Sequence, residues 1–250
     1  MATTGNGGDQ LPDASGVFAT THWSVVLAAK RSDGLLADDA LERLCRIYWP
    51  PLYAFIRREG YDAHEAQDLT QEFLSRFVQK EWLGHLQDQR GKFRSFLLTF
   101  LKHFLADQRV RASAQKRGGG QPLLSLDACE AEEREALGPV DDLSADQLYD
   151  RSWARAVMDE TARRLREEYA ARGRTALFEQ LKELQPGEHG ERSYAQIGAT
   201  LGLTEQAVKN AVHCFRRRYG ELLRDEIAQT VDGPGEVESE LQHLKKVFAG

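Results

Sequence analysis

The spacing of apolar residues between the prolines constrains this chain most strongly. The segment 52–121 contains no proline, and its apolar side chains recur three or four residues apart from Ala66 to Val78 and again from Phe93 to Leu105. That spacing is typical of one face of an α-helix, and no alternating apolar run is long enough to indicate a strand. The sequence therefore predicts an all-α fold.

Further helices, and the breaks between them, predict how the chain is organised. Helical patterns are expected at 152–172, 174–184, 194–201 and 205–227. A glycine triplet at 118–120 followed by Pro122 ends the first helical block, because glycine costs backbone entropy and proline removes a hydrogen-bond donor. We expect two small helical domains at 18–117 and 150–228, an acidic flexible linker at 118–149, and a C-terminal extension at 229–250.

Charge is distributed in blocks, although the net charge of the chain is only -6. Residues 90–117 hold eight basic residues and one acidic residue, whereas residues 121–150 hold one basic and nine acidic residues. Phosphate is attracted by local potential rather than by total charge. The first block is therefore suited to nucleic acid, and the second, with few large apolar residues, is suited to a solvated linker.

The sharpest local pattern predicts a helix-turn-helix over 194–212. Gly202 permits a left-handed turn after the first helix, and Thr204 is a suitable N-cap for the second. Gly198 is small, which lets the two helix backbones approach. The apolar residues expected at the contact are Ile197, Leu201, Leu203, Val208 and Ala211.

The second helix of this pair would present a polar outer face. Its residue types can bond base edges or phosphates, and a major groove admits such a helix. The candidate DNA contacts are Thr204, Gln206, Lys209, Asn210, His213, Arg216 and Arg217. A plain helical hairpin with a solvated charged face is the alternative interpretation of these residues.

A second group of candidate DNA contacts lies on the helix expected from Phe93. Arg94, Lys102 and Arg109 flank its apolar stripe within an arc of about 80°, at ~100° per residue. Arg111 follows at the end of this segment. Phosphate contacts beside an aromatic-rich core are one way in which a helical module grips a separating duplex. A charged helix edge without a partner is the alternative, and it is the better interpretation of this edge taken alone.

Two ordered motifs resemble a known family. The runs HEAQDLTQEF at 64–73, GKFRSFL at 91–97 and DQRVR at 107–111 resemble the second conserved region of extracytoplasmic-function sigma factors. The segment 193–218 is similar to the fourth region of that family. The resemblance covers most of residues 20–228. The family often has asparagine where His103 stands, and alanine is usual where Gly198 stands.

The resemblance implies separate roles for the two halves of the chain. The helix that carries Asp68, Gln71 and Glu72 would dock on a coiled coil of the largest subunits of core RNA polymerase. The basic edge of the next helix would hold melted promoter DNA, and the helix from Glu205 would read the double-stranded upstream element.

The resemblance also implies that the loop from about Glu81 to Lys92 captures a base flipped from the promoter near the start site. Unstacking a base costs a few kcal/mol, which contacts to the extruded base must offset. The candidate contacts are Trp82, His85 and Lys92. A small-core role is the alternative for Trp82.

Motifs of an enzyme do not occur in the sequence. It has no Gly-rich phosphate loop, no HExxH and no GxSxG, and no two of its seven histidines lie four residues apart. The three cysteines form no CxxC pair, which disfavours a metal cluster or a disulfide framework and indicates a reducing cytoplasm. No apolar run approaches the ~20 residues of a membrane span.

These observations predict a cytoplasmic, non-enzymatic sigma factor without a metal or cofactor. Its expected partners are core RNA polymerase and double-stranded and melted promoter DNA, with an anti-sigma factor as a further candidate. The alternative is a helix-turn-helix transcriptional regulator that acts without binding the polymerase core.

Overall fold

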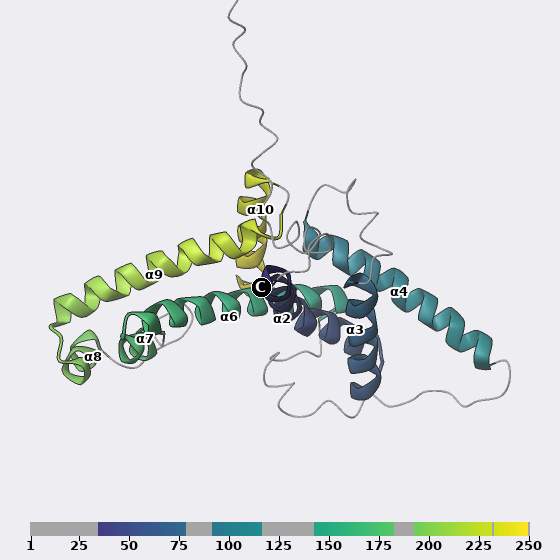
Figure 1. Cartoon of the computed structure of the whole chain (residues 1–250), viewed down its shortest axis with the longest axis horizontal. Coiled ribbons are helices and arrows are strands. Elements are labelled where there is room, and N and C mark those ends of the chain that lie inside the picture. The colour runs from purple at the N-terminus through teal and green to yellow at the C-terminus, as the bar shows by residue number, and fades with distance from the viewer. Residues whose placement is uncertain (1–34, 79–91, 117–142, 183–192, 232, 250) are drawn as a thin grey trace, which may run out of the picture.

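The computed structural model describes residues 35–78, 92–116, 143–182, 193–231 and 233–249 (Figure 1). Within these ranges every helix is an α-helix and the only extended pairing is an isolated bridge between Lys92 and Val231. The all-α prediction is therefore confirmed for the described part of the chain. The helices are α2 (Leu35–Arg58), α3 (Ala63–Val78), α4 (Phe93–Lys116), α6 (Ala145–Ala171), α7 (Thr175–Lys182), α8 (Tyr194–Leu201), α9 (Glu205–Ala228) and α10 (Pro234–Ala249).

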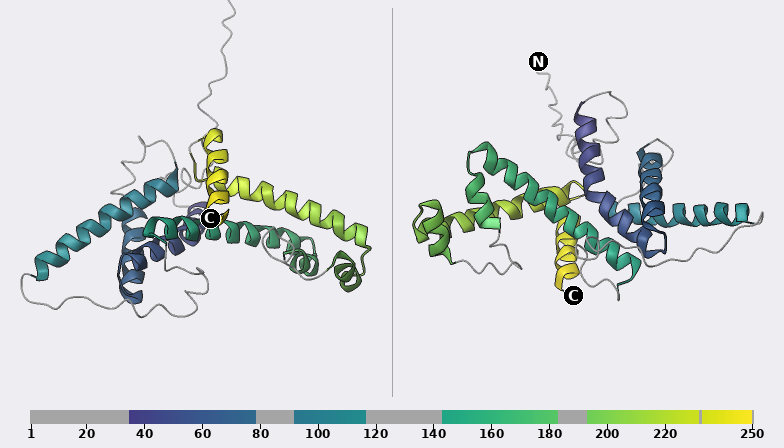
Figure 2. Two further views of the ribbon diagram at one scale, coloured as in Figure 1. Left: turned by 180° about the vertical axis from the view of Figure 1, so that it is seen from behind. Right: turned by 90° about the horizontal axis from the view of Figure 1, so that it is seen from below.

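Helix α2 runs through two consecutive prolines, so the proline-free segment that begins at residue 52 does not mark the start of a helix. Pro50 and Pro51 lie inside it. Each proline removes one backbone donor from the helix. Apolar burial on both sides offsets that cost, because Ile47 and Leu52 are almost completely inaccessible to solvent. Figure 2 shows the helix changing direction along its length, as expected where prolines interrupt the hydrogen-bond ladder.

Helix α6 begins seven residues earlier than the predicted start at Ser152. Ser144 is its N-cap: the Ser144 hydroxyl accepts a hydrogen bond from the backbone N–H of Gln147, and the Gln147 side chain accepts one from the backbone N–H of Ser144. This reciprocal pair satisfies two amides that a helix start leaves without partners. The last residues of the predicted linker, 145–149, are consequently helical, whereas 117–142 lie outside the described residues.

The helices form two hydrophobic cores at the two ends of a pair of long helices. The first core combines α2, α3 and α4 with the N-terminal half of α6, the C-terminal end of α9 and α10. The second core combines the C-terminal half of α6 with α7, α8 and α9 as far as Leu222. Helices α6 and α9 extend side by side from one core to the other (Figures 1 and 2).

The first core contains residues from outside the predicted first domain, 18–117. Trp153, which the sequence analysis assigned to the second domain, is completely buried in the first core, and Tyr149 is buried beside it. The C-terminal extension also joins this core, through Val237, Leu241 and Leu244 of α10. The C-terminal extension expected at 229–250 therefore folds back on the rest of the protein.

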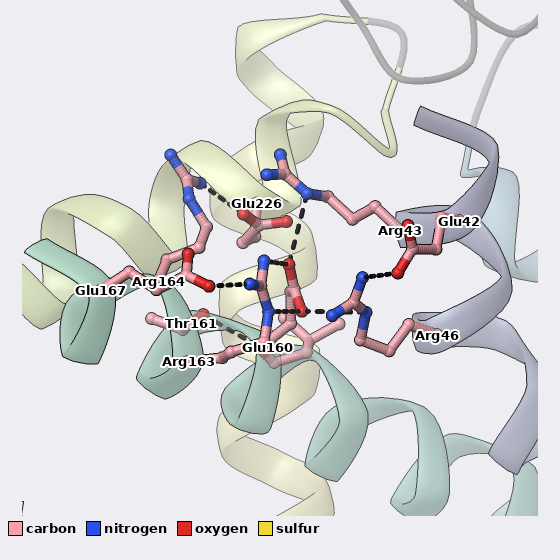
Figure 3. Close-up of polar contacts among 10 residues, drawn as sticks. Glu42, Arg43, Arg46, Glu160, Thr161, Arg163, Arg164, Glu167 and Glu226 are labelled. Carbon is pink, nitrogen blue, oxygen red and sulfur yellow. Dashed lines mark hydrogen bonds and ion pairs between the residues drawn. The ribbon is translucent and has the colours of Figure 1, made fainter. Parts of the chain in front are cut away.

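A cluster of buried charges connects α2, α6 and α9 (Figure 3). Glu160 is 2% exposed, and its carboxylate accepts two hydrogen bonds from Arg163, at 2.7 and 2.8 Å. Arg43 and Arg46 of α2 approach the same carboxylate, at 3.3 and 3.7 Å. A buried charge must be paired to be tolerated, so the arginines of two helices compensate Glu160. The next residue of α6, Arg164, pairs with the buried Glu226 of α9.

Candidate nucleic-acid interface

The predicted turn between α8 and α9 is present with the expected geometry. Gly202 has φ 66° and ψ 29°, which is the left-handed conformation that favours glycine. The Thr204 hydroxyl accepts a hydrogen bond from the backbone N–H of Ala207 and so caps α9. The N–H of Leu203 donates to the carbonyl of Gly198 at 2.8 Å, and a Cβ on Gly198 would lie 2.6 Å from the Leu203 carbonyl oxygen. The backbone approach that was expected at Gly198 is therefore confirmed.

The polar side of α9 lies opposite the side that packs in the second core. Val208, Val212 and Phe215 are buried in that core. The candidate DNA contacts Thr204, Gln206, Lys209, Asn210, His213, Arg216 and Arg217 are all exposed. The polar face is therefore accessible along the first half of α9.

Local contacts order several side chains of this face. The Gln206 amide donates to the Asn210 side-chain oxygen at 3.2 Å. Lys209 pairs with Glu205 at 2.7 Å, and this hydrogen bond and charge raise the pKa of the Lys209 ammonium. Arg217 lies 3.6 Å from Glu221. These exposed pairs contribute little to stability, so a phosphate can replace the carboxylates.

The basic residues expected along α4 do not all lie in the same environment. Lys102, Arg109 and Arg111 are exposed. Lys102 pairs with Asp146 of α6 at 2.5 Å, and Arg109 pairs with Glu59 at 2.5 Å. The hydrogen bond that Arg109 donates to Glu59 outweighs partial desolvation and raises the pKa of Arg109.

Arg94 does not belong to this exposed edge. It is 7% exposed, and its guanidinium donates to both oxygens of Glu240 on α10, at 3.2 and 3.3 Å. It also pairs with Asp150 of α6 and lies over the Trp153 ring, 5.0 Å from the centroid. The expectation that Arg94 contacts DNA phosphate needs correction for this conformation, because α6 and α10 cover it. The helical arc alone could not indicate this, since the covering residues are 50 or more positions away.

Of the residues expected to capture a flipped base, only Lys92 lies within the described ranges; Trp82 and His85 lie outside them. Lys92 immediately precedes α4 and is tied to the C-terminal extension. Its ammonium donates to the Ser239 hydroxyl at 2.9 Å and lies 3.5 Å from Glu240. The backbone N–H of the next residue, Phe93, donates to the Thr230 carbonyl at 3.0 Å.

The residues expected to dock on polymerase lie on α3. Asp68 and Gln71 are exposed, and Asp68 lies 3.1 Å from His64. Glu72 is half-buried, pairs with Arg76, and accepts a hydrogen bond from the Gln108 amide of α4 at 2.9 Å. Asp68 and Gln71 are therefore accessible to a partner, whereas Glu72 also holds α3 against α4.

Neither a metal site nor a membrane-spanning helix is present among the described residues. No group of three or more histidine, cysteine, aspartate or glutamate side chains there could hold a metal ion. No helix among these residues has the length and apolar character needed to cross a membrane.

The order of these elements can be compared with known families. A family model described as ECF sigma factor matches residues 37–225, from the first turn of α2 to the last turn of α9. The chain belongs to the ECF sigma factor family. Searches of curated proteins and of solved structures found no match.

Family membership gives the general activity. ECF sigma factors are non-enzymatic transcription initiation factors that act with RNA polymerase in a promoter-specific way. Core RNA polymerase and promoter DNA are therefore the partners of this sigma factor. The family match ends at residue 225, so α10 lies beyond it.

Proposed function

We propose that this sigma factor contacts promoter DNA through two separate faces and docks on core RNA polymerase through a third. The first half of α9 reads the double-stranded upstream element. The exposed part of the α4 edge holds the backbone of the melted start-proximal element. The exposed side of α3 around Asp68 and Gln71 contacts the polymerase.

The exposed polar face of α9 carries this proposal. The N-cap and the tight turn from α8 define where α9 begins, and its buried side packs in the second core. The polar side chains of its first half are therefore presented together at one end of the protein. An ordered helix loses little conformational entropy on entering a major groove, and amides and cations at such positions can bond base edges and phosphates. Lys209, Arg216 and Arg217 are the cations of this face.

The α4 edge supports the second contact through Lys102, Arg109 and Arg111. Contacts from such cations to phosphate position DNA without reading its sequence. Lys92 remains the described candidate for base capture, and Trp82 and His85 remain predictions from the family resemblance. An anti-sigma factor remains a further candidate partner.

Two substitutions test separately the docking face, which is the exposed side of α3 around Asp68 and Gln71, and the reading face, which is the exposed polar face of α9. Asp68→Asn is expected to weaken binding to core polymerase while leaving binding of the free protein to upstream-element DNA unchanged. Lys209→Ala is expected to have the opposite pattern. Asp225→Asn, an exposed aspartate near the end of α9, removes the same charge as Asp68→Asn and serves as the matched control. Simultaneous loss of both activities in Asp68→Asn, with the control unaffected, would contradict separate faces.

A further inference from the structure

Acidic residues of the C-terminal half neutralise basic residues at the start and middle of α4. Lys92 lies near Glu236 and Glu240 of α10, at 3.9 and 3.5 Å. Lys102 pairs with Asp146, in the first turn of α6. Both lysines are among the DNA contacts expected from the sequence, yet in this conformation each already has an anionic partner from a distant part of the chain.

Arg94, between these two lysines, anchors the covering helices. Its buried bonds to Glu240 and its pair with Asp150 join α4 to both α10 and α6. The Tyr149 hydroxyl adds a hydrogen bond to the backbone carbonyl of Arg94, at 3.1 Å. Buried, multiply bonded charges of this kind are costly to separate. The carboxylates of Asp146 and Glu236 are thereby held beside the basic edge.

The Lys102–Asp146 pair differs from the Arg94 cluster in its access to solvent. The side chains are 46% and 55% exposed. Lys102 lies eight residues after Arg94, which is about 12 Å along a helix. Exposed pairs are weak, so an incoming phosphate can displace Asp146 without disrupting the buried anchor.

We infer that α6 and α10 form an intramolecular shield over the first part of the basic edge of α4, up to Lys102, in which Asp146 occupies Lys102 where a DNA phosphate would otherwise bind. This inference rests on the proposed function, because it assumes that Lys102 contacts DNA. Promoter DNA must displace the carboxylate, so the free protein binds single-stranded DNA more weakly than its exposed lysines alone would allow. Binding that favours the displaced state shifts the equilibrium toward it.

The test measures binding of the full-length protein to a fluorescent oligothymidylate by anisotropy at low salt. Phosphate contacts carry no sequence information, so a generic strand is a sufficient probe. Asp146→Asn is expected to tighten binding about two- to fivefold, the scale of one exposed ion pair. Asp225→Asn removes the same charge far along the chain and is expected to change the affinity much less. Thermal unfolding of each variant checks that the fold is retained.

A second substitution identifies the partner of Asp146. Lys102→Ala in the Asp146→Asn background is expected to abolish the gain, because the freed lysine is then missing. The inference is overturned if Asp146→Asn binds no more tightly than Asp225→Asn, or if the gain survives without Lys102.

Lys102→Ala is also measured in complexes with core polymerase on promoter DNA. Weaker complexes there, combined with no gain from Asp146→Asn in the free protein, would overturn the shield and retain the proposed contact. Complexes unaffected by Lys102→Ala would overturn both.

Discussion

Arg94 of α4 and Glu240 of α10 form a buried pair in which Nε and Nη2 of the arginine donate to the two carboxylate oxygens at 3.3 and 3.2 Å. Glu240 is 1% exposed, and Val237 and Leu241 of the same helix join the first core. The C-terminal helix is therefore part of the folding unit that contains α4, although the match to the sigma factor family ends before it.

Removing Glu240 tests this relationship. Glu240→Ala is expected to lower the free energy of unfolding by about 3 kcal/mol, because it leaves Arg94 buried with one carboxylate partner fewer. Urea denaturation measures the change. Glu238→Ala removes an exposed carboxylate of the same helix, which pairs with Arg224 at 3.3 Å, and is expected to cost under about 1 kcal/mol. Equal losses of unfolding free energy in the two variants would contradict a stabilising role for the buried Arg94–Glu240 pair.

The turn between α8 and α9 depends on the missing side chain of Gly198. Gly198→Ala is expected to destabilise the protein by about 1–3 kcal/mol, because its Cβ would lie 2.6 Å from a backbone oxygen that cannot move independently. Gly220→Ala, within α9, has open space around the new methyl group and is expected to stabilise by about 0.5–1 kcal/mol. Thermal unfolding of both variants provides the comparison, and a neutral Gly198→Ala would contradict the close backbone contact.

Glu160 is expected to make stability depend on pH. Burial raises its pKa, but the hydrogen bonds and charge of Arg163 and the charges of Arg46 and Arg43 outweigh burial, so the net pKa lies below the ordinary value of 4.5. A carboxyl whose pKa is lowered by folding contributes stability that is fully present above its unfolded pKa and is lost as the pH falls through its folded pKa.

Glu160→Gln therefore is expected to destabilise the protein by about 3 kcal/mol at neutral pH. The difference from the unsubstituted protein should shrink as the pH is lowered below 4.5. Denaturation at several pH values measures it. Glu42→Gln, which removes an exposed partner of Arg46, is the control and is expected to have a small effect at every pH. A difference that stays constant down to strongly acidic pH would contradict the charge cluster as the cause.

The reading face of α9 predicts a loss of DNA affinity without a loss of stability. Arg217→Ala is expected to weaken binding to upstream-element DNA by about 1–3 kcal/mol if a base contact is lost. Arg166→Ala removes an exposed arginine of α6, which pairs with Glu179, and controls for the change in net charge. Anisotropy with duplex DNA gives both affinities. If the two variants weaken binding equally, this part of α9 is a solvated surface.

Local structure was predictable from the sequence where neighbouring residues determine it. Gly202 acts through its left-handed backbone, Thr204 through its capping hydroxyl and Gly198 through its small size. The sequence indicated each of these local roles. Helix α2 was missed because proline is a strong local helix breaker, whereas the burial that offsets Pro50 and Pro51 comes from helices far along the chain.

Buried charges were not predictable from the sequence either, because their burial also depends on segments far along the chain. Glu160 and Arg163 are three residues apart, a spacing typical of an exposed ion pair on a helix. In the folded chain Glu160 is buried, and Arg43 and Arg46 of the distant α2 also approach it. Arg94 was expected on an exposed edge because its position around its own helix gives no information about α10, which covers it. Tertiary contacts between distant segments therefore account for both differences.

In vitro transcription with core RNA polymerase and a library of promoter sequences tests the central claim most directly. The account predicts that the protein forms a stable complex with core enzyme and yields transcripts from a defined class of promoters. It also predicts that Asp68→Asn lowers transcription through polymerase binding and that Lys209→Ala lowers it through promoter recognition. Sequence-specific DNA binding without a complex with core enzyme and without promoter-dependent transcripts would contradict it.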